Sequence, residues 1–315
     1  MGDTAPPHRS GFVAICGRPN VGKSTLLNAL LGEPLAVATA HPQTTRERML
    51  GVWTRPEFQA VLVDTPGIHR ARSALNKYMV DQAIAGARDV DLVLLLAETP
   101  AVRDDEQAEA WEPGPVALEG FEAIKALNRP MALVLTKIDR IADRRHLLPV
   151  ITAWTKLHEF ETVIPTSALR GEGLDELQSV VVNSLPEGPR YYDSEQLSDR
   201  HLRWHAAELV RAELFEHLGQ ELPYSCAVMV TGWREQPTRD QVKATVFVER
   251  DSQKGMVIGK GGRVIKALSM GARRRISELT GRDCDLRLSV DVARNWTRDP
   301  DKLPRMGYTD PESSS

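Results

Sequence analysis

The chain has 315 residues, of which 42% are hydrophobic and 26% are charged, and its formal net charge is −3. This length and composition suit two globular domains, each with its own core, and exclude a low-complexity chain. A net charge near zero excludes an overall attraction to nucleic acid, so any nucleic-acid site must be a local patch.

Short apolar strands alternate with amphipathic helical stretches in the first part of the chain. Continuous apolar runs predict strands at residues 12–16, 59–64, 90–97, 131–136 and 162–167. Such runs are typical of a parallel sheet that helices cover on both faces. The alternation therefore predicts an α/β domain, doubly wound around a mostly parallel sheet.

The sequence GRPNVGKS, residues 17–24, lies between the first predicted strand and a predicted helix. It fits the pattern G-x-x-x-x-G-K-[ST], in which backbone N–H groups and a helix N-terminus bind phosphates. Lys23 is predicted to reach the β- and γ-phosphates, and Ser24 to bind Mg²⁺. The predicted nucleotide-binding residues of this loop are Gly17, Arg18, Pro19, Asn20, Val21, Gly22, Lys23, Ser24 and Thr25.

Two motifs that follow this loop suit the Mg²⁺ and the γ-phosphate. In QTTR, residues 43–46, the hydroxyl of Thr44 or Thr45 could complete the Mg²⁺ site. In DTPG, Asp64 ends an apolar strand and can hold the Mg²⁺ hydration shell, while the N–H of Gly67 can meet the γ-phosphate. Thr65 and Pro66, which lie between these two residues, are included in the predicted nucleotide site.

Two later strand ends carry motifs that suit guanine, namely TKID at residues 136–139 and SAL at residues 167–169. The carboxylate of Asp139 can accept from both N1–H and the 2-amino group of guanine, whereas adenine offers neither donor. The prediction is therefore GTP and GDP as ligands. The residues predicted at the base are Thr136, Lys137, Asp139, Ser167 and Ala168.

The order of these motifs resembles that of the translation-factor-like class of GTPases. Thr136 stands where that class usually has an Asn that ties the loop to the phosphate loop, so the departure bears on affinity. Related loops favour Thr45 over Thr44 for Mg²⁺, because Thr45 directly precedes Arg46. The sequence alone does not separate the two threonines.

Ile68 occupies the position at which Ras-like enzymes carry a water-orienting glutamine. Similar GTPases with a hydrophobic residue there include members that use an Asn of the phosphate loop to help bind K⁺, and Asn20 is at the matching position. The resemblance predicts slow intrinsic GTP hydrolysis that is faster in K⁺ than in Na⁺. Lys23, Asn20, Thr45 and Gly67 are the predicted catalytic residues.

The segment LPEGPRYY, residues 185–192, interrupts the alternation with two prolines and a glycine and predicts a domain boundary. We assign residues 1–186 to the first domain, with a mobile N-terminal tail, 190–308 to the second, and 309–315 to a flexible tail. The second domain reads as α-β-β-α-α-β. Its first helix has Leu202, Ala206, Leu209, Val210, Leu214 and Leu218 at helical spacing.

The sequence MVIGKGGRVIK lies between two helical segments of the second domain and lacks the G-K-[ST] ending of a nucleotide loop. Its GxxG turn resembles that of a type II KH domain, which clamps about four nucleotides of single-stranded RNA. Seven basic residues and no acidic one occur from Lys254 to Arg275. The arginines at 273–275 cannot all point one way, so the predicted RNA-binding residues are Val257, Ile258, Gly259, Lys260, Gly261, Gly262, Arg263 and Lys266.

A GTPase domain followed by a type II KH domain resembles the Era family of bacterial ribosome-associated GTPases. The resemblance implies binding near the 3′ end of 16S ribosomal RNA, a role in maturation of the small ribosomal subunit, and a nucleotide state that controls RNA access. It also implies peripheral association with the inner face of the cell membrane. An alternative stays open, in which the protein is an RNA-binding module or RNA chaperone with the nucleotide as a structural or regulatory ligand. Residues 104–121 depart from the family and are predicted to form an inserted loop.

Three features bear on location and assembly. The cysteines show no metal-binding spacing and are predicted to be reduced and buried. The N-terminus lacks the apolar stretch of a secretory signal, and no apolar run approaches the roughly 18 residues of a transmembrane helix. We therefore expect a cytoplasmic protein, and nothing in the sequence demands more than a monomer.

Overall fold

The computed structural model describes residues 7–38, 41, 44–68, 73–219 and 221–309. Contacts divide these residues into two compact units. One comprises the residues up to 68 with 79–199, and the other comprises 73–78 with those from 200 onward. This division lies later than the predicted boundary at 186–190, which stays a prediction. Residues 1–6 and 310–315 of the predicted tails lie outside the described residues, whereas Arg9 already begins a strand.

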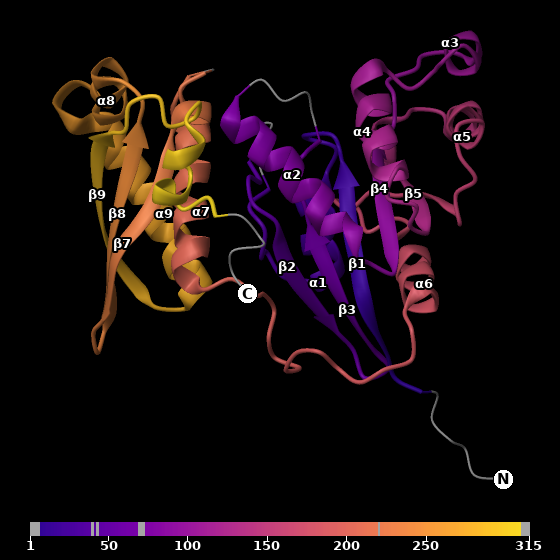
Figure 1. Cartoon of the computed structure of the whole chain (residues 1–315), viewed down its shortest axis with the longest axis horizontal. Helices are drawn as coiled ribbons and strands as arrows, with labels where there is room; N and C mark the ends of the chain where they lie inside the picture. The colour runs from indigo at the N-terminus through magenta and orange to yellow at the C-terminus, as the bar shows by residue number, and fades with distance from the viewer. Residues whose placement is uncertain (1–6, 39–40, 42–43, 69–72, 220, 310–315) are drawn as a thin grey trace. The chain divides into compact units, whose positions relative to one another are not determined.

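In its described residues, the first unit forms one sheet with strand order β2-β3-β1-β4-β5-β6 (Figure 1). The strands are β1 (Arg9–Gly17), β2 (Met49–Thr54), β3 (Phe58–Asp64), β4 (Leu92–Glu98), β5 (Met131–Thr136) and β6 (Val163–Pro165). Only β2 is antiparallel to its neighbour. The five predicted strands and the mostly parallel, doubly wound fold are thus confirmed.

Strand β2 was not predicted, because Gly51 interrupts its apolar run. Packing requires a glycine at this position, because a Cβ at Gly51 would lie only 2.8 Å from the Cδ1 atom of Leu27. Leu27 belongs to helix α1 (Lys23–Leu31), which ends at Gly32 as expected from the sequence. The glycine therefore allows the helix to lie close to the edge of the sheet.

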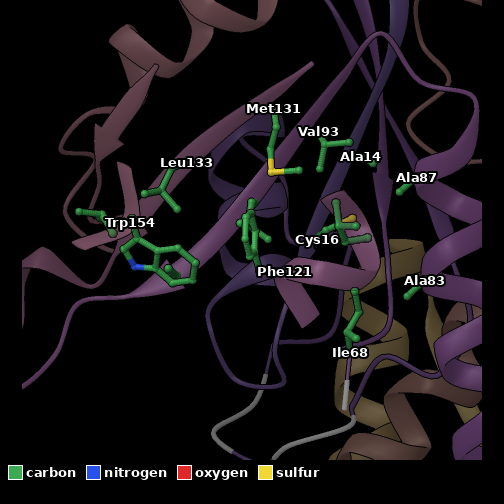
Figure 2. Packing of buried hydrophobic residues seen from close by; sticks show 14 of the residues in the cluster. Ala14, Cys16, Ile68, Ala83, Ala87, Val93, Phe121, Met131, Leu133 and Trp154 are labelled. Carbon is green, nitrogen blue, oxygen red and sulfur yellow. The ribbon is translucent and has the colours of Figure 1, made fainter. Parts of the chain in front are cut away.

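Helices cover both faces of this sheet. Helices α1 and α6 (Leu174–Ser184) contact each other and the β3 side. On the opposite face, a hydrophobic cluster contains Ala83 of α2 (Ala74–Arg88), Phe121 of α4 (Pro115–Lys125) and Trp154 of α5 (Leu147–Thr155). Figure 2 shows these side chains together with Ala14 and Cys16 of β1. All three cysteines of the chain are buried, as predicted.

The prediction of an inserted loop at residues 104–121 is wrong. This segment forms helix α3 (Asp105–Glu109) and most of α4. Asp104 caps α3 by accepting from the backbone N–H of Gln107, and Pro115 occupies the first turn of α4, where its missing N–H costs nothing. Its proline and glycine content therefore marks helix starts, and Phe121 is completely buried in the core.

The segment that leaves the first unit is held against the sheet. Ser10 N donates to Pro186 O at 3.0 Å, and Val52 N of edge strand β2 donates to Leu197 O at 2.9 Å. The fully buried side chain of Gln59 accepts from the backbone N–H groups of Tyr191 and Tyr192. These bonds explain why a proline-rich and glycine-rich segment remains part of the first unit up to Asp199.

The second unit packs helices against a sheet of order β7-β8-β9 in the described chain (Figure 1). The elements are α7 (Leu202–His217), β7 (Ala227–Glu235), β8 (Arg239–Val248), α8 (Asp251–Ile258), α9 (Arg263–Thr280) and β9 (Asp283–Val292), in the predicted order. Val210, Leu214 and Leu268 lie in its core, but Leu202 is 49% exposed because it stands in the first turn of α7.

Short 3₁₀ turns complete the described chain. They are η1 (Ile138–Arg140), η2 (Arg144–His146), η3 (Pro223–Ser225), η4 (Lys260–Gly262), η5 (Pro300–Lys302) and η6 (Pro304–Met306). Within the described ranges, none of the helices is both long and apolar enough to cross a lipid bilayer.

Candidate functional site

A cavity of about 490 Å³ lies over the loop between β1 and α1. Strand β1 pairs with β3 on one side and β4 on the other, which is the switch point where ligands bind in such sheets. The predicted residues that line the cavity are Arg18, Pro19, Asn20, Val21, Gly22, Lys23, Ser24, Thr25, Thr44, Thr45, Gly67, Thr136, Lys137, Asp139 and Ala168. Folding thus brings motifs separated by more than a hundred residues around one cavity.

Lys23 is buried at the start of α1, where its Nζ atom donates to Gly17 O at 3.2 Å and to Arg18 O at 3.0 Å. Burial lowers the pKa of Lys23 to about 8, although the carboxylate of Asp64 opposes this shift. An anion beside a desolvated ammonium group of this kind stabilises its charged form strongly. The position of Lys23 therefore suits a phosphate in the cavity.

Three oxygen-bearing side chains meet beside Lys23. Ser24 Oγ donates to Asp64 Oδ2 at 3.0 Å and lies 3.1 Å from Thr45 Oγ1. The other carboxylate oxygen, Asp64 Oδ1, is buried without a hydrogen-bond partner among the described residues. Burial raises the pKa of Asp64 to about 6, because the charged form is poorly solvated there. A buried oxygen without a partner and two hydroxyls form a set that fits Mg²⁺.

The DTPG segment approaches the phosphate loop closely. A Cβ at Gly67 would lie 2.5 Å from the backbone nitrogen of Pro19, so the contact requires glycine. Ile68 donates its N–H to Gly17 O at 3.1 Å, and its side chain belongs to the hydrophobic cluster in Figure 2. Ile68 is therefore a core residue.

Five predicted members of the site do not line the cavity, namely Gly17, Asp64, Thr65, Pro66 and Ser167. Thr65 is fully buried and donates from Oγ1 to Ile15 O at 2.8 Å, so its hydroxyl ties β3 to β1. Pro66 is buried as well. Gly17 O accepts from Lys23 Nζ and Ser167 Oγ donates to Asp139, so both residues hold side chains that do line the cavity.

The far end of the cavity holds the TKID and SAL residues. Ser167 Oγ donates to Asp139 Oδ1 at 2.7 Å, and this hydrogen bond is the main reason that the pKa of Asp139 is lowered. Lys137 has φ of 59° and donates from Nζ to Asn20 O at 2.6 Å. Asp139 is thus held as an ionised acceptor, the state that recognition of two guanine N–H groups requires.

Thr136 links its strand end to the phosphate loop, as the Asn that usually stands at this position does in related GTPases. Its Oγ1 atom donates to Val21 O of the phosphate loop at 2.7 Å, and the residue is 6% exposed. A hydroxyl on this strand end therefore reaches the phosphate loop directly.

Replacing Thr136 by Val keeps the side-chain shape and leaves the carbonyl of Val21 without this donor. An unsatisfied buried acceptor costs roughly 1–3 kcal/mol, so we expect GDP affinity to fall roughly 5- to 100-fold. Titration calorimetry on the nucleotide-free protein measures this. T136N, which offers a donor again, is the matched control, and equal affinity of T136V and the original chain would contradict the role of the tie.

Sequence reasoning missed Glu98, whose carboxylate joins several cations at the cavity edge. Its Oε1 atom lies 3.0 Å from Lys137 Nζ and 3.1 Å from an Nη atom of Arg140, and Oε2 lies 3.9 Å from Arg18. The only signal in the sequence was an acidic residue at the carboxyl end of an apolar strand, where ligand sites occur in α/β sheets.

The GxxG turn of the second unit has the backbone that only glycines adopt readily. Gly259, Gly261 and Gly262 have φ of 72°, 64° and 75°. A Cβ at Gly259 would lie 2.9 Å from Cβ of Val264, whereas Cβ atoms at Gly261 and Gly262 would meet nothing within 4 Å. The last two glycines therefore present open backbone.

The side chains around this turn divide into exposed and buried sets. Lys260, Arg263 and Lys266 are exposed, and Ile258 is half-buried. Val257 is completely buried in the core of the unit, so it supports the turn from beneath and cannot contact a base. Its inclusion among the RNA-contacting residues was wrong, because an apolar residue next to a glycine turn can face either way.

The arginine triplet at the middle of α9 does not act as one patch. Arg275 pairs with Glu213 at 2.9 Å and Glu216 at 2.5 Å, and Arg274 lies 3.9 Å from Glu278. Acidic partners therefore offset part of the triplet's charge. The lysines and arginine at 260, 263 and 266 make the positive surface beside the turn.

Comparisons with known proteins match a GTPase family over the nucleotide cavity and a KH family over the GxxG turn. Residues 12–137 match the family described as "50S ribosome-binding GTPase", and residues 221–297 match the KH domain family. "GTPase Era" of Geobacter metallireducens is 41% identical over 96% of this chain and 99% of the relative, and that of Geotalea daltonii is 43% identical over 97% and 99%.

Two solved structures resemble nearly the whole chain. A crystal structure of Era in complex with MgGDPNP and nucleotides 1506–1542 of 16S ribosomal RNA has a TM-score of 0.89 and 34% identity, and it covers 96% of this chain and 100% of that one. Aquifex aeolicus Era bound to GDP and AlF₄⁻, a single-residue variant, has a TM-score of 0.88 with the same identity and coverage.

The fold, the nucleotide cavity and the GxxG turn define a P-loop GTPase joined to a KH domain. At this identity and coverage, the chain belongs to the Era family of GTPases. It binds GTP and GDP and hydrolyses GTP to GDP and phosphate.

Proposed function

We propose that GTP lies along the cavity with its phosphates at the loop of residues 17–25 and its guanine at Asp139. The observation that carries this assignment is that Lys23 and Asp139 line one cavity, and that Asp64 accepts from Ser24, which lines the same cavity. The backbone N–H groups at the start of α1 meet the phosphates, and Lys23 offsets charge on the β- and γ-phosphates.

Mg²⁺ would be held by Ser24 and Thr45 directly, with Asp64 acting on its hydration shell. The contact of Thr45 with Ser24 supports Thr45 over Thr44, which also lines the cavity. Bound there, the ion would neutralise charge that develops on the phosphates. A water of that hydration shell would then donate to Asp64 Oδ1, which has no hydrogen-bond partner among the described residues. This explains why a carboxylate is buried at this position.

Hydrolysis requires a water to attack the γ-phosphorus while the bond to the β,γ-bridging oxygen breaks, giving GDP and phosphate. The buried Ile68 cannot orient this water. Backbone groups such as the N–H of Gly67 therefore contribute more to stabilising the transition state. We assign Asn20, which has φ of 62° and lines the cavity, to a K⁺ site that offsets transition-state charge. This arrangement predicts slow intrinsic turnover.

GTP turnover is expected to be on the order of tenfold faster in KCl than in NaCl at equal ionic strength, because one added cation stabilises the transition state. The variant N20G keeps the left-handed backbone and removes the amide oxygen, so it should lose most of the difference between the salts. Equal turnover of the original chain in the two salts would reject the role of Asn20.

The second unit is proposed to bind single-stranded RNA near the 3′ end of 16S ribosomal RNA. The open backbone at Gly261 and Gly262 and the exposed cations beside it support this. The relative whose solved structure contains nucleotides 1506–1542 of 16S ribosomal RNA supports the identity of the RNA. We infer that the protein assists maturation of the small ribosomal subunit, acting in the cytoplasm as a monomer.

Peripheral association with the inner face of the cell membrane is implied by the family resemblance alone.

Two versions of this function differ in what GTP does. In the first, the nucleotide state controls RNA binding; in the second, RNA binds equally well in every state. RNA affinity measured with GDP and with a non-hydrolysable GTP analogue separates them. We expect the two affinities to differ at least about tenfold, and equal values would favour the binding-module version.

A further inference from the structure

The carboxylate of Glu98 joins segments of the chain that surround the nucleotide cavity. Glu98 ends strand β4, and in the parallel register of β4 and β5 it stands beside Thr136, the residue that precedes Lys137. Its Oε1 atom lies 3.0 Å from Lys137 Nζ, and each of the two side chains is 24% exposed. The neighbouring strand end thus supplies an acceptor to a lysine that the proposed function places at the guanine.

Lys137 has a conformation that needs support from its surroundings. Its φ of 59° lies in the left-handed region, which a lysine rarely adopts. Its Nζ atom donates to Asn20 O of the phosphate loop at 2.6 Å and also meets Glu98. Both Lys137 and Glu98 line the cavity. The place of the lysine stem in the cavity therefore depends on the two acceptors that hold its tip.

Two other cations near Glu98 interact with it less strongly. Arg140 approaches the same Oε1 atom at 3.1 Å but is 65% exposed, and Arg18 lies 3.9 Å from Oε2 and is 47% exposed. Water screens such exposed pairs, so each contributes little. Lys137, which is closer and less exposed, is therefore the partner through which Glu98 can act on a ligand.

We propose that Glu98 is a positioning residue for guanine recognition and acts through Lys137. It holds the ammonium group beside the phosphate loop, so the lysine stem is already in place when the base enters. This role rests on the proposed placement of guanine at the end of the cavity with Lys137 and Asp139. Because the base is remote from the phosphorus that water attacks, this support stabilises bound GTP and its transition state equally.

Steady-state GTP hydrolysis in KCl tests this role. E98A should raise KM about three- to tenfold and leave kcat within about twofold, because a loss of uniform binding appears in KM when chemistry is slow. E98Q keeps an acceptor oxygen without the charge, so its KM should lie between those of E98A and the original chain. A general loss of structure would lower kcat as well, since fewer molecules would be active.

A double-mutant cycle identifies the partner of Glu98. In the K137A background, E98A should cause no further rise in KM, because the side chain that it positions is already absent. In the R140A background, E98A should still raise KM about as much as it does in the original chain.

Glu172 supplies the matched control. Its carboxylate also stands between two arginines, with Arg144 at 2.5 Å and Arg170 at 4.0 Å, but it does not line the cavity. E172A should therefore leave KM unchanged.

Equal KM values for E98A and the original chain overturn the proposal. A rise in KM that is as large in the K137A background as in the original chain also overturns it, because Glu98 would then act through another group. If K137A itself kept the original KM, the proposed placement of guanine would be wrong, and the role of Glu98 would be wrong with it.

Discussion

Replacing Asp139 by Asn is expected to lower the affinity for GDP at least about 100-fold. The ionised carboxylate, held by Ser167 at 2.7 Å, can accept from both N–H groups on the guanine edge. An Asn amide keeps one acceptor and turns an NH₂ donor toward the 2-amino group. Mispairing of buried polar groups is what gives discrimination of several orders of magnitude. Equilibrium binding of a fluorescent GDP analogue measures the change.

The same substitution should improve binding of xanthosine diphosphate, because its C2 oxygen can accept from the Asn NH₂ group. D143N is the matched control, since Asp143 is a nearby aspartate that pairs with Arg145 and does not line the cavity. If D139N bound GDP as tightly as the original chain, or failed to prefer the xanthine nucleotide, the guanine assignment would be wrong.

Replacing Gly261 by Asp is expected to weaken binding of single-stranded RNA on the order of 10- to 100-fold, without unfolding the second unit. A Cβ at this position meets nothing within 4 Å, and Asp tolerates φ of 64° better than most residues. The added carboxylate would repel the RNA backbone and block its close approach to the turn. Fluorescence anisotropy with an RNA of the 16S 3′-end sequence measures the loss.

Gly281 provides a matched control at the other end of α9. It has φ of 65° and equally open space, so G281D adds the same charge in the same conformation away from the turn. G281D should bind RNA like the original chain. A similar loss in both variants would mean that net charge, and not the GxxG turn, determines the affinity.

The sequence predicted those parts of the fold and site that local patterns determine. Apolar runs located five strands, and the loop at residues 17–24 is recognisable because its glycines, Lys23 and Ser24 must be adjacent to cradle phosphates. The order of elements in the second unit was predictable for the same reason, since the helical and strand periods differ clearly there.

Other features depend on tertiary contacts and could not be predicted. The glycine of strand β2 is explained only by its packing against Leu27 of helix α1. The helices within residues 104–121 are stabilised by burial of Phe121 in the core. Glu98 gains its place in the site only when Arg18 and Lys137 are folded around it. Thr136 takes over the role of the usual Asn by donating to Val21 O. This hydrogen bond depends on the folded distance between the two residues, which the sequence does not give.

The central claim is that the two glycine loops work as one GTP-dependent RNA switch. The most direct measurement is GTP turnover in KCl, with and without single-stranded RNA of the 16S 3′-end sequence, for the original chain and G261D. We predict that RNA raises turnover of the original chain and leaves that of G261D unchanged. Turnover that ignores RNA while the original chain binds it tightly would contradict the claim and favour the binding-module version.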